Sequence, residues 1–200
     1  MKNKKFIDEG YIKFNCKWID EKLSVEVPQS LKFWRDKLFQ LKQIGYDKEL
    51  KVGYGNISIR IGKNILISGT QTGSIYPIED THFTLVTKYN ISKNEVVCGG
   101  KLKASSETMT HAAIYHASED INAIIHVHNK LLWEYLSNKV PATNKEVSYG
   151  TPDMAFEIVR LFNETDVIRK KIIVMKGHED GIIVFGSNLD DAGNVLLSYL

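Results

Sequence analysis

Two runs of β-branched and apolar residues, separated by only two positions, constrain the fold of this 200-residue chain more than any other feature. Residues 57–61 and 64–68 flank Gly62-Lys63, and such a short link between two strand-like runs is typical of a β-hairpin. Most neighbouring strands have links of hairpin length, so the sequence predicts a mixed, mainly antiparallel sheet. The other strands are predicted at residues 83–89, 95–98, 123–127, 171–175 and 182–185.

Helices are predicted to flank this sheet. Apolar residues recur at helical spacing over 31–44, with Ser30 as the expected N-cap. Further helices are predicted over residues 106–117, from Thr151-Pro152 through Leu161, and over about 189–200. The combination predicts an α/β fold.

The length of the chain fits a single domain over residues 1–200, since domains of roughly 100–150 residues are the commonest. Residues 11–27 mix aromatic, aliphatic and charged positions, which predicts one or two strands or an N-terminal arm. Cys16 and Cys98 lie far apart and show no zinc-thiolate spacing. We expect two reduced, partly buried thiols, with a disulfide as the alternative.

Charge and hydropathy exclude several classes of partner. Twenty-six Lys and Arg against twenty-four Asp and Glu leave a net charge of +2, so no nucleic acid partner is expected. The longest apolar stretches, such as 182–185, are far shorter than the ~20 residues that a membrane helix needs. The basic start at residues 1–5 is followed by Asp8 and Glu9 rather than by an apolar run. We therefore expect a soluble cytoplasmic protein without an export signal.

The strongest local signal for chemistry is the pair His126 and His128, at the end of a predicted strand. Side chains two residues apart in a strand point to the same face, so the two imidazoles converge. A buried imidazole costs free energy unless it binds a metal or makes hydrogen bonds. Metal coordination would satisfy both rings, and two hydrogen-bonded histidines at a strand end are the alternative.

His178 is a candidate third ligand because it lies in a turn between Gly177 and Gly181 that joins two predicted strands. Three histidines would leave a tetrahedral zinc ion one open position, as catalytic sites do. The alternative is a solvated loop histidine. The remaining histidines have no such setting and are expected to be surface or packing residues: His82, His111 and His116.

Ser105, Ser106 and Glu107 lie at the start of a predicted helix, where hydroxyls and free backbone N–H groups can bind an anion such as phosphate. An ordinary N-cap followed by a first-turn acid explains the same residues. The glycine-containing segments 53–56 and 68–73 are explained as turns, and neither is a dinucleotide-binding motif.

These motifs follow one another in an order that resembles the class II aldolase/adducin family. The order is residues 55–58 (GNIS), the segment Ser68 to Gly73, Ser105-Ser106-Glu107, His126-Val127-His128 and Gly177-His178. The resemblance runs from about residue 30 to the C-terminus and leaves residues 1–27 outside. It implies a three-layer α/β/α sandwich around a mainly antiparallel sheet, and a homotetramer with active sites between subunits.

By that resemblance His126, His128 and His178 are the zinc ligands, with Mn²⁺ or Co²⁺ as alternative metals, and Glu107 is the catalytic acid/base. Positions that hold a substrate phosphate are matched by Asn56, Thr72, Gly73, Ser105 and Ser106. The implied function is zinc-dependent cleavage of a phosphorylated ketose through a metal-stabilised enediolate. A dehydratase or 4-epimerase of a sugar phosphate, or a non-catalytic adducin-like module, are the alternatives.

The sequence departs from the family pattern after the His-x-His strand. Fuculose-type aldolases carry an interfacial tyrosine in that region, whereas this chain shortens it. The nearest tyrosine, Tyr149, aligns better with an aromatic residue of the following Tyr-Gly-Thr turn. Residues 129–133 also replace the usual small-residue and histidine pattern. The leaving-group acid and the substrate are therefore left open.

Overall fold

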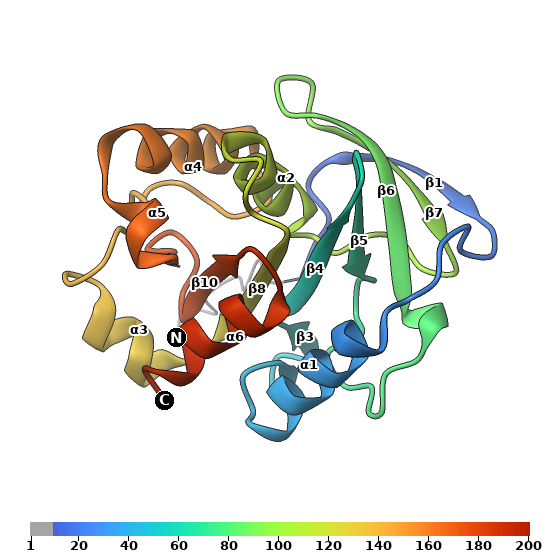
Figure 1. Ribbon diagram of the computed structural model, residues 1–200, viewed down its shortest axis with the longest axis horizontal. Coiled ribbons are helices and arrows are strands. Elements are labelled where there is room, and N and C mark those ends of the chain that lie inside the picture. The colour runs from blue at the N-terminus through green and yellow to red at the C-terminus, as the bar shows by residue number, and fades with distance from the viewer. Residues whose placement is uncertain (1–9) are drawn as a thin grey trace, which may run out of the picture.

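The computed structural model describes residues 10–200 (Figure 1). The basic start at residues 1–5 and the following Asp8 and Glu9 lie outside the described residues. The strands are β1 (Asn15–Asp20), β2 (Gly45–Asp47), β3 (Val52–Tyr54), β4 (Asn56–Ile61), β5 (Asn64–Ser68), β6 (Phe83–Asn90), β7 (Glu95–Gly100), β8 (Ala123–His128), β9 (Ile172–Val174) and β10 (Gly181–Gly186). The helices are α1 (Gln29–Gln40), the 3-10 helix η1 (Asp80–His82), α2 (Thr108–Ala117), α3 (Lys130–Leu136), α4 (Pro152–Glu164), α5 (Val167–Lys170) and α6 (Leu189–Leu197).

Eight strands form the central sheet in the order β1-β7-β6-β5-β4-β8-β10-β9. The edge strand β1 runs parallel to β7, and the other neighbours in this sheet are antiparallel. The predicted hairpin is confirmed as β4 and β5, with Ile61 opposite Asn64. The predicted α/β fold with a central sheet is also confirmed, and the sheet is a mixed one.

Helices cover both faces of the sheet (Figure 1). One hydrophobic cluster joins α2 and α4 to residues such as Ile124 of β8, and the other joins α1 and α6 to residues such as Ile125. Since side chains alternate along a strand, His126 and His128 share the face of Ile124. The two histidines therefore point to the side of the sheet on which α2 begins.

The strands β1 and β7 place the two cysteines side by side. Cys16 and Cys98 are free thiols whose Sγ atoms lie 3.6 Å apart, with Cys98 buried and Cys16 half-buried. The expectation of two reduced, partly buried thiols agrees with this arrangement.

The predicted N-cap of α1 is wrong. The cap residue is Pro28 rather than Ser30, and no side chain caps this helix. Proline fixes its own φ near −65°, and here Pro28 has φ −59° and accepts a hydrogen bond from the Leu31 amide at 3.0 Å. The helix therefore begins before Ser30, whose hydroxyl makes no cap.

The predicted cap of α4 is confirmed, because Thr151 Oγ1 accepts a hydrogen bond from the Met154 amide at 3.3 Å. We expect Thr151→Ala to lower the free energy of unfolding by about 1 kcal/mol, the usual value of an N-cap side chain. Ser30→Ala is the matched control and should cost no more than about 0.5 kcal/mol. Urea denaturation of the two variants measures both values, and equal losses would contradict the cap assignment.

Candidate functional site

Three imidazoles from two segments of the sheet meet at one point. His126 and His128 come from the end of β8, and His178 comes from the turn between β9 and β10. One nitrogen of each ring can be chosen so that the three atoms lie within 4.8 Å of one another, and the ring centroids are 4.7 to 5.1 Å apart. The predicted ligand set is thus brought together.

The His178 turn has its shape because glycine precedes it. A Cβ atom on Gly177 would lie 1.8 Å from the carbonyl oxygen of Val147, which no side chain can tolerate. The turn is closed by hydrogen bonds from the His178 amide to Met175 O and from the Gly181 amide to His178 O, each 3.0 Å long. The backbone on both sides of His178 is therefore fixed.

A hydrogen bond at Nδ1 sets the tautomer of the His126 ring. Nδ1 lies 3.2 Å from the carbonyl oxygen of Ile182 and must donate to it, so the lone pair is on Nε2. Nε2 of His126 and Nε2 of His128 are 3.1 Å apart. Two nitrogens on one tetrahedral zinc ion are about 3.3 Å apart, given Zn–N bonds of about 2.0 Å. The observed spacing fits a shared metal ion.

Burial keeps the His128 ring in the neutral form that a metal needs. Desolvation, followed by the neighbouring His178 and His126, places the pKa of His128 well below its ordinary value. A metal ion does not have to compete with protons for such an imidazole at neutral pH. A divalent cation therefore fits this cluster by spacing, tautomer and protonation state.

Glu107 lies directly before α2 and is 2% exposed. Its Oε1 is 3.1 Å from Nδ1 of His178, and its Oε2 accepts a hydrogen bond from Thr110 Oγ1 at 2.8 Å. Burial alone would raise the pKa of Glu107, but His178, His126 and Thr110 together lower it to about 2. The carboxylate is thus ionised and held beside the three-histidine cluster.

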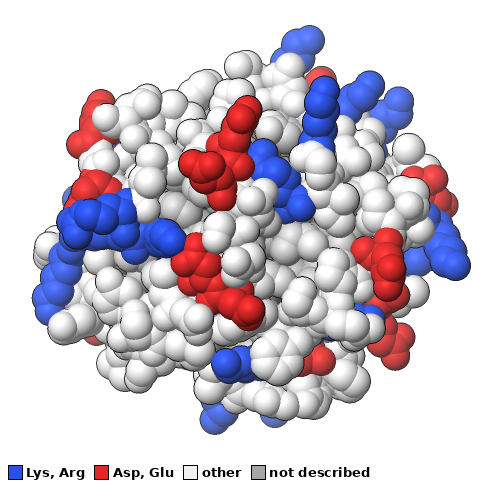
Figure 2. All heavy atoms as spheres, viewed as in Figure 1, with Lys and Arg blue, Asp and Glu red and all other residues white. Residues whose placement is uncertain are grey.

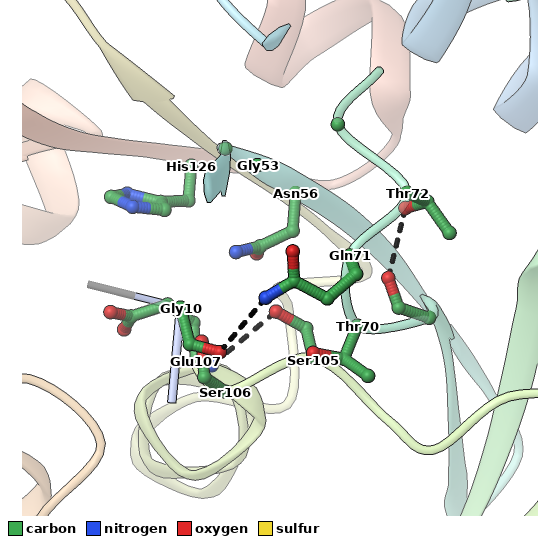
Figure 3. A pocket seen from close by; sticks show the side chains of 13 residues that line it. Gly10, Gly53, Asn56, Thr70, Gln71, Thr72, Ser105, Ser106, Glu107 and His126 are labelled. Carbon is green, nitrogen blue, oxygen red and sulfur yellow. Dashed lines mark hydrogen bonds between the residues drawn. The ribbon is translucent and has the colours of Figure 1, made fainter. Parts of the chain in front are cut away.

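The predicted phosphate positions line one pocket next to these groups. The pocket has a volume of about 350 Å³, counted out to its open mouth. Its lining includes all of the predicted anion-binding residues together with Glu107 and His126: Asn56, Thr72, Gly73, Ser105 and Ser106. Figure 3 shows Asn56, Gln71 and Ser105 directed into the same space, with Asn56 on the strand next to His126 and Gln71 and Ser105 farther from that ring. One end of the pocket is thus formed by His126 and Glu107, and we call the rest of its lining the neutral end.

The neutral end has a buried amide that lacks a partner in residues 10–200. The thirteen residues that line the whole pocket include no Lys or Arg, so its polar groups other than Glu107 and His126 are uncharged. Asn56 is 6% exposed, and its Oδ1 has no hydrogen-bond partner among the described residues. Since the O and N of an amide are assigned from their partners, either atom of this side chain is available to a ligand. A buried amide without a partner is costly, so a polar occupant is expected.

The loop that contains Thr72 and Gly73 is locked by backbone contacts. Thr70 N donates to Lys103 O at 2.9 Å, and Thr72 Oγ1 donates to Gly69 O at 2.9 Å. A Cβ on Gly73 would lie 2.0 Å from the carbonyl oxygen of Gly45, so only glycine permits this approach. These contacts join the loop to the segment that leads into Ser105.

The sequence did not reveal several residues around the site. Tyr149 is buried and stacks on His178 with ring centroids 4.5 Å apart, and the Lys13 ammonium lies 3.9 Å from the centre of the Tyr149 ring. Gly10 and Gln71 line the pocket, with Gln71 Nε2 3.5 Å from Gly10 O. These contacts join segments far apart in the chain, and no local pattern signals them.

The other histidines lie outside the three-histidine cluster, as expected for packing or surface residues. His116 is exposed, and His82 is half-buried in η1. His111 is fully buried, and its Nδ1 lies 2.7 Å from Ser58 Oγ. Desolvation, together with the nearby His126, lowers the pKa of His111 to about 3.

The molecule is thus an α/β protein in which a largely buried three-histidine cluster and a carboxylate lie beside a pocket lined by neutral polar groups. Comparisons with known proteins identify the family to which this fold belongs. Residues 37–199 match the family described as the Class II Aldolase and Adducin N-terminal domain. The chain therefore belongs to the class II aldolase and adducin family.

Individual relatives span most of the chain. An L-fuculose phosphate aldolase of Methanocaldococcus jannaschii is 31% identical over 163 residues, which cover 74% of this chain and 81% of that protein. A second, from Methanococcus maripaludis, is 26% identical over 161 residues with the same coverage. Among solved structures, an L-fuculose 1-phosphate aldolase has a TM-score of 0.62 at 22% identity and covers 88% of this chain and 82% of its own. A sugar-phosphate aldolase from Thermotoga maritima has a TM-score of 0.60 at 14% identity, with coverage of 84% and 88%.

The surface adds two observations. On the face in Figure 2, basic and acidic side chains are interspersed between wide uncharged areas. In residues 10–200, no helix has the length and apolar character needed to cross a membrane.

The pKa of His111 predicts a pH dependence of stability. Its pKa is about 3 when folded and about 6.5 when unfolded, so between these values the unfolded chain binds the extra proton. This contribution is fully present above pH 6.5 and is lost as the pH falls toward 3. We expect the metal-free protein to lose about 2 kcal/mol through this residue on acidification from pH 7.5 to pH 5.

Denaturant unfolding of wild type and His111→Asn across this range, with chelator present, measures the effect. Contributions from all other groups are common to both proteins, so the variant should show the shallower loss of stability. Parallel curves would contradict a neutral, buried His111.

Proposed function

We propose that the chain is a zinc-dependent aldolase that cleaves a phosphorylated ketose. The observation that carries the proposal is the placement of three imidazoles and the ionised Glu107 at one end of a pocket whose other end is lined by neutral polar groups. The relatives named as L-fuculose phosphate aldolases support it. Zinc is favoured because three histidines leave one position open for substrate, and Mn²⁺ or Co²⁺ would fit the same donors.

The two ends of the pocket suit a substrate with a carbonyl at one end and a phosphate at the other. A divalent cation held by His126, His128 and His178 would supply Lewis-acid polarisation of a carbonyl and its neighbouring hydroxyl. Asn56, the Thr72-Gly73 segment and the two serines before α2 would hold the phosphate with neutral donors. Binding at both ends would fix the bond to be broken beside Glu107.

Glu107 would move the proton. Its carboxylate is ionised, is buried and is held by Thr110 on one oxygen, so the other oxygen faces the histidine cluster. A base with a pKa of about 2 is weak by itself, but a substrate hydroxyl next to a divalent cation is made far more acidic than in water. Glu107 could then accept that proton and return it to the product carbon.

Further properties of the family are proposed on the same grounds. The position of α2 and α4 on one face and α1 and α6 on the other supports a three-layer α/β/α sandwich. We also infer a cytoplasmic homotetramer with active sites between subunits and a small sugar phosphate as the partner. Light scattering on the purified protein tests the tetramer, and a monomer with full activity would refute interfacial sites.

The substrate class is tested by a product screen. Purified protein with added zinc, manganese or cobalt is incubated with phosphorylated pentuloses, hexuloses and methylthioribulose phosphate, and the products are identified by mass spectrometry. We expect a divalent metal to be bound and a ketose phosphate to be split into two carbonyl fragments. Products with an unchanged carbon skeleton would identify a dehydratase or epimerase instead. Metal content far below one equivalent, with no turnover, would favour a non-catalytic adducin-like module.

The role of Glu107 is tested by Glu107→Gln. We expect this variant to keep its metal and to lose turnover by about a hundredfold or more, because a neutral amide cannot take up the proton. His126→Ala should lose the metal and the activity together, which separates the two roles. Glu164→Gln, an exposed change on α4, is the matched control. Turnover within a factor of about two of wild type in Glu107→Gln would refute the assignment.

A further inference from the structure

A buried cation lies directly behind the neutral end of the pocket. Arg35 belongs to α1 and is 1% exposed. Its Nη2 donates to the carbonyl oxygen of Thr72 at 2.6 Å and to that of Gly73 at 3.4 Å. Arg35 thus contacts the backbone of the two residues that form the anion-binding loop. It lies outside residues 37–199, the part of the chain that matches the family.

The charge of Arg35 is only partly balanced by its neighbours. The acidic group that it contacts is Asp36, whose Oδ1 is 3.5 Å from Nη1 and also accepts a hydrogen bond from the Ile78 amide at 3.0 Å. Burial lowers the pKa of the guanidinium and Asp36 raises it, and a guanidinium stays protonated in proteins. The pair with Asp36 is a single contact of 3.5 Å and leaves part of the desolvation cost of the buried guanidinium in place. An anion in the pocket would offset part of that cost.

The contacts also set the direction of the loop peptides. In a trans peptide the C=O and the N–H point in opposite directions. Because the Thr72 carbonyl points at Arg35, the Gly73 amide points away from it, and the same holds for the Gly73 carbonyl and the Ser74 amide. The guanidinium therefore polarises two peptides so that their positive ends face away from α1. This is the arrangement that favours an anion on the far side of the loop.

We propose that Arg35 is the positioning residue that makes the 69–73 loop a site for a phosphate dianion, acting through the Thr72 and Gly73 peptides rather than by touching the ligand. The inference rests on the phosphate part of the proposed function. It explains how a pocket with no Lys or Arg among its lining residues in 10–200 can select a doubly charged group.

A purely structural role for Arg35, in which its hydrogen bonds only hold the loop against α1, makes a different prediction. Asp36→Asn removes the neighbouring negative charge but keeps these hydrogen bonds of Arg35, and an asparagine Oδ1 can still accept from the Ile78 amide. The substitution would raise the net positive charge behind the loop. The charge role therefore predicts tighter phosphate binding in Asp36→Asn, and a structural role predicts unchanged or weaker binding.

The experiment is calorimetric titration of the zinc-loaded full chain with inorganic phosphate. We expect Arg35→Met to weaken binding about tenfold or more, Arg35→Lys to weaken it by no more than about threefold, and Asp36→Asn to tighten it about two- to fivefold. Circular dichroism and zinc content show whether each variant is folded. If Arg35→Met does not fold, the phosphate affinities of Arg35→Lys and Asp36→Asn still distinguish the charge role of Arg35 from a purely structural one.

Phosphate bound directly to zinc is excluded by repeating the comparison in the His126→Ala background, where the ratio of affinities with and without the Arg35→Met substitution should persist. Equal affinities in wild type and a folded Arg35→Met protein, or unchanged or weaker binding in Asp36→Asn, would overturn the role of Arg35 and leave the proposed function standing. Absence of phosphate binding by the wild-type protein itself would overturn the phosphate part of the proposed function, and the role of Arg35 with it.

Discussion

The position of β8 in the middle of the sheet is the constraint on which the site depends. This strand is paired on both sides, with Asn56 of β4 and Ile183 of β10 opposite His126. Its side chains have only two directions available, and both lead into a hydrophobic cluster. An imidazole placed there must find a partner inside the protein. The strand pairing thus brings Asn56 next to His126, and the start of α2 brings Glu107 to His178 of the same cluster.

The two ends of the pocket differ in charge, and under the proposed function each end would hold a different part of the substrate. Burial holds His128 neutral, while Glu107 is kept ionised by His178, His126 and Thr110, so one negative group lies beside the three imidazoles. That arrangement favours a cation. At the other end Arg35 lies behind the loop and favours an anion. Each of these buried charges is costly alone, and the occupants that would offset the cost have opposite signs.

The sequence predicted those parts of the fold and site that depend on local periodicity. The hairpin at Gly62-Lys63 and the convergence of His126 and His128 follow from the two-residue repeat of a strand. The contact of Arg35 with the loop 37 residues later could not be predicted, since an arginine in an amphipathic helix has the same local pattern whether it is buried or solvated. The short helix α3 was also missed, because only Leu132 and Leu136 are buried in it and so few positions give no clear repeat.

Residues before the family-matched segment complete the environment of the site. Gly10 lines the pocket, the Tyr11 amide donates to the Tyr149 hydroxyl at 3.2 Å, and Lys13 lies over the same ring. Tyr149 in turn stacks on His178, so the arm contacts a candidate metal ligand through one aromatic ring. The groups proposed for the reaction lie within residues 37–199, whereas this arm and Arg35 lie outside it. The residues that line the pocket thus lie mainly within the family-matched segment, and the groups before it act on the site from its edge, through Gly10, the Tyr149 ring and the backbone of the 69–73 loop.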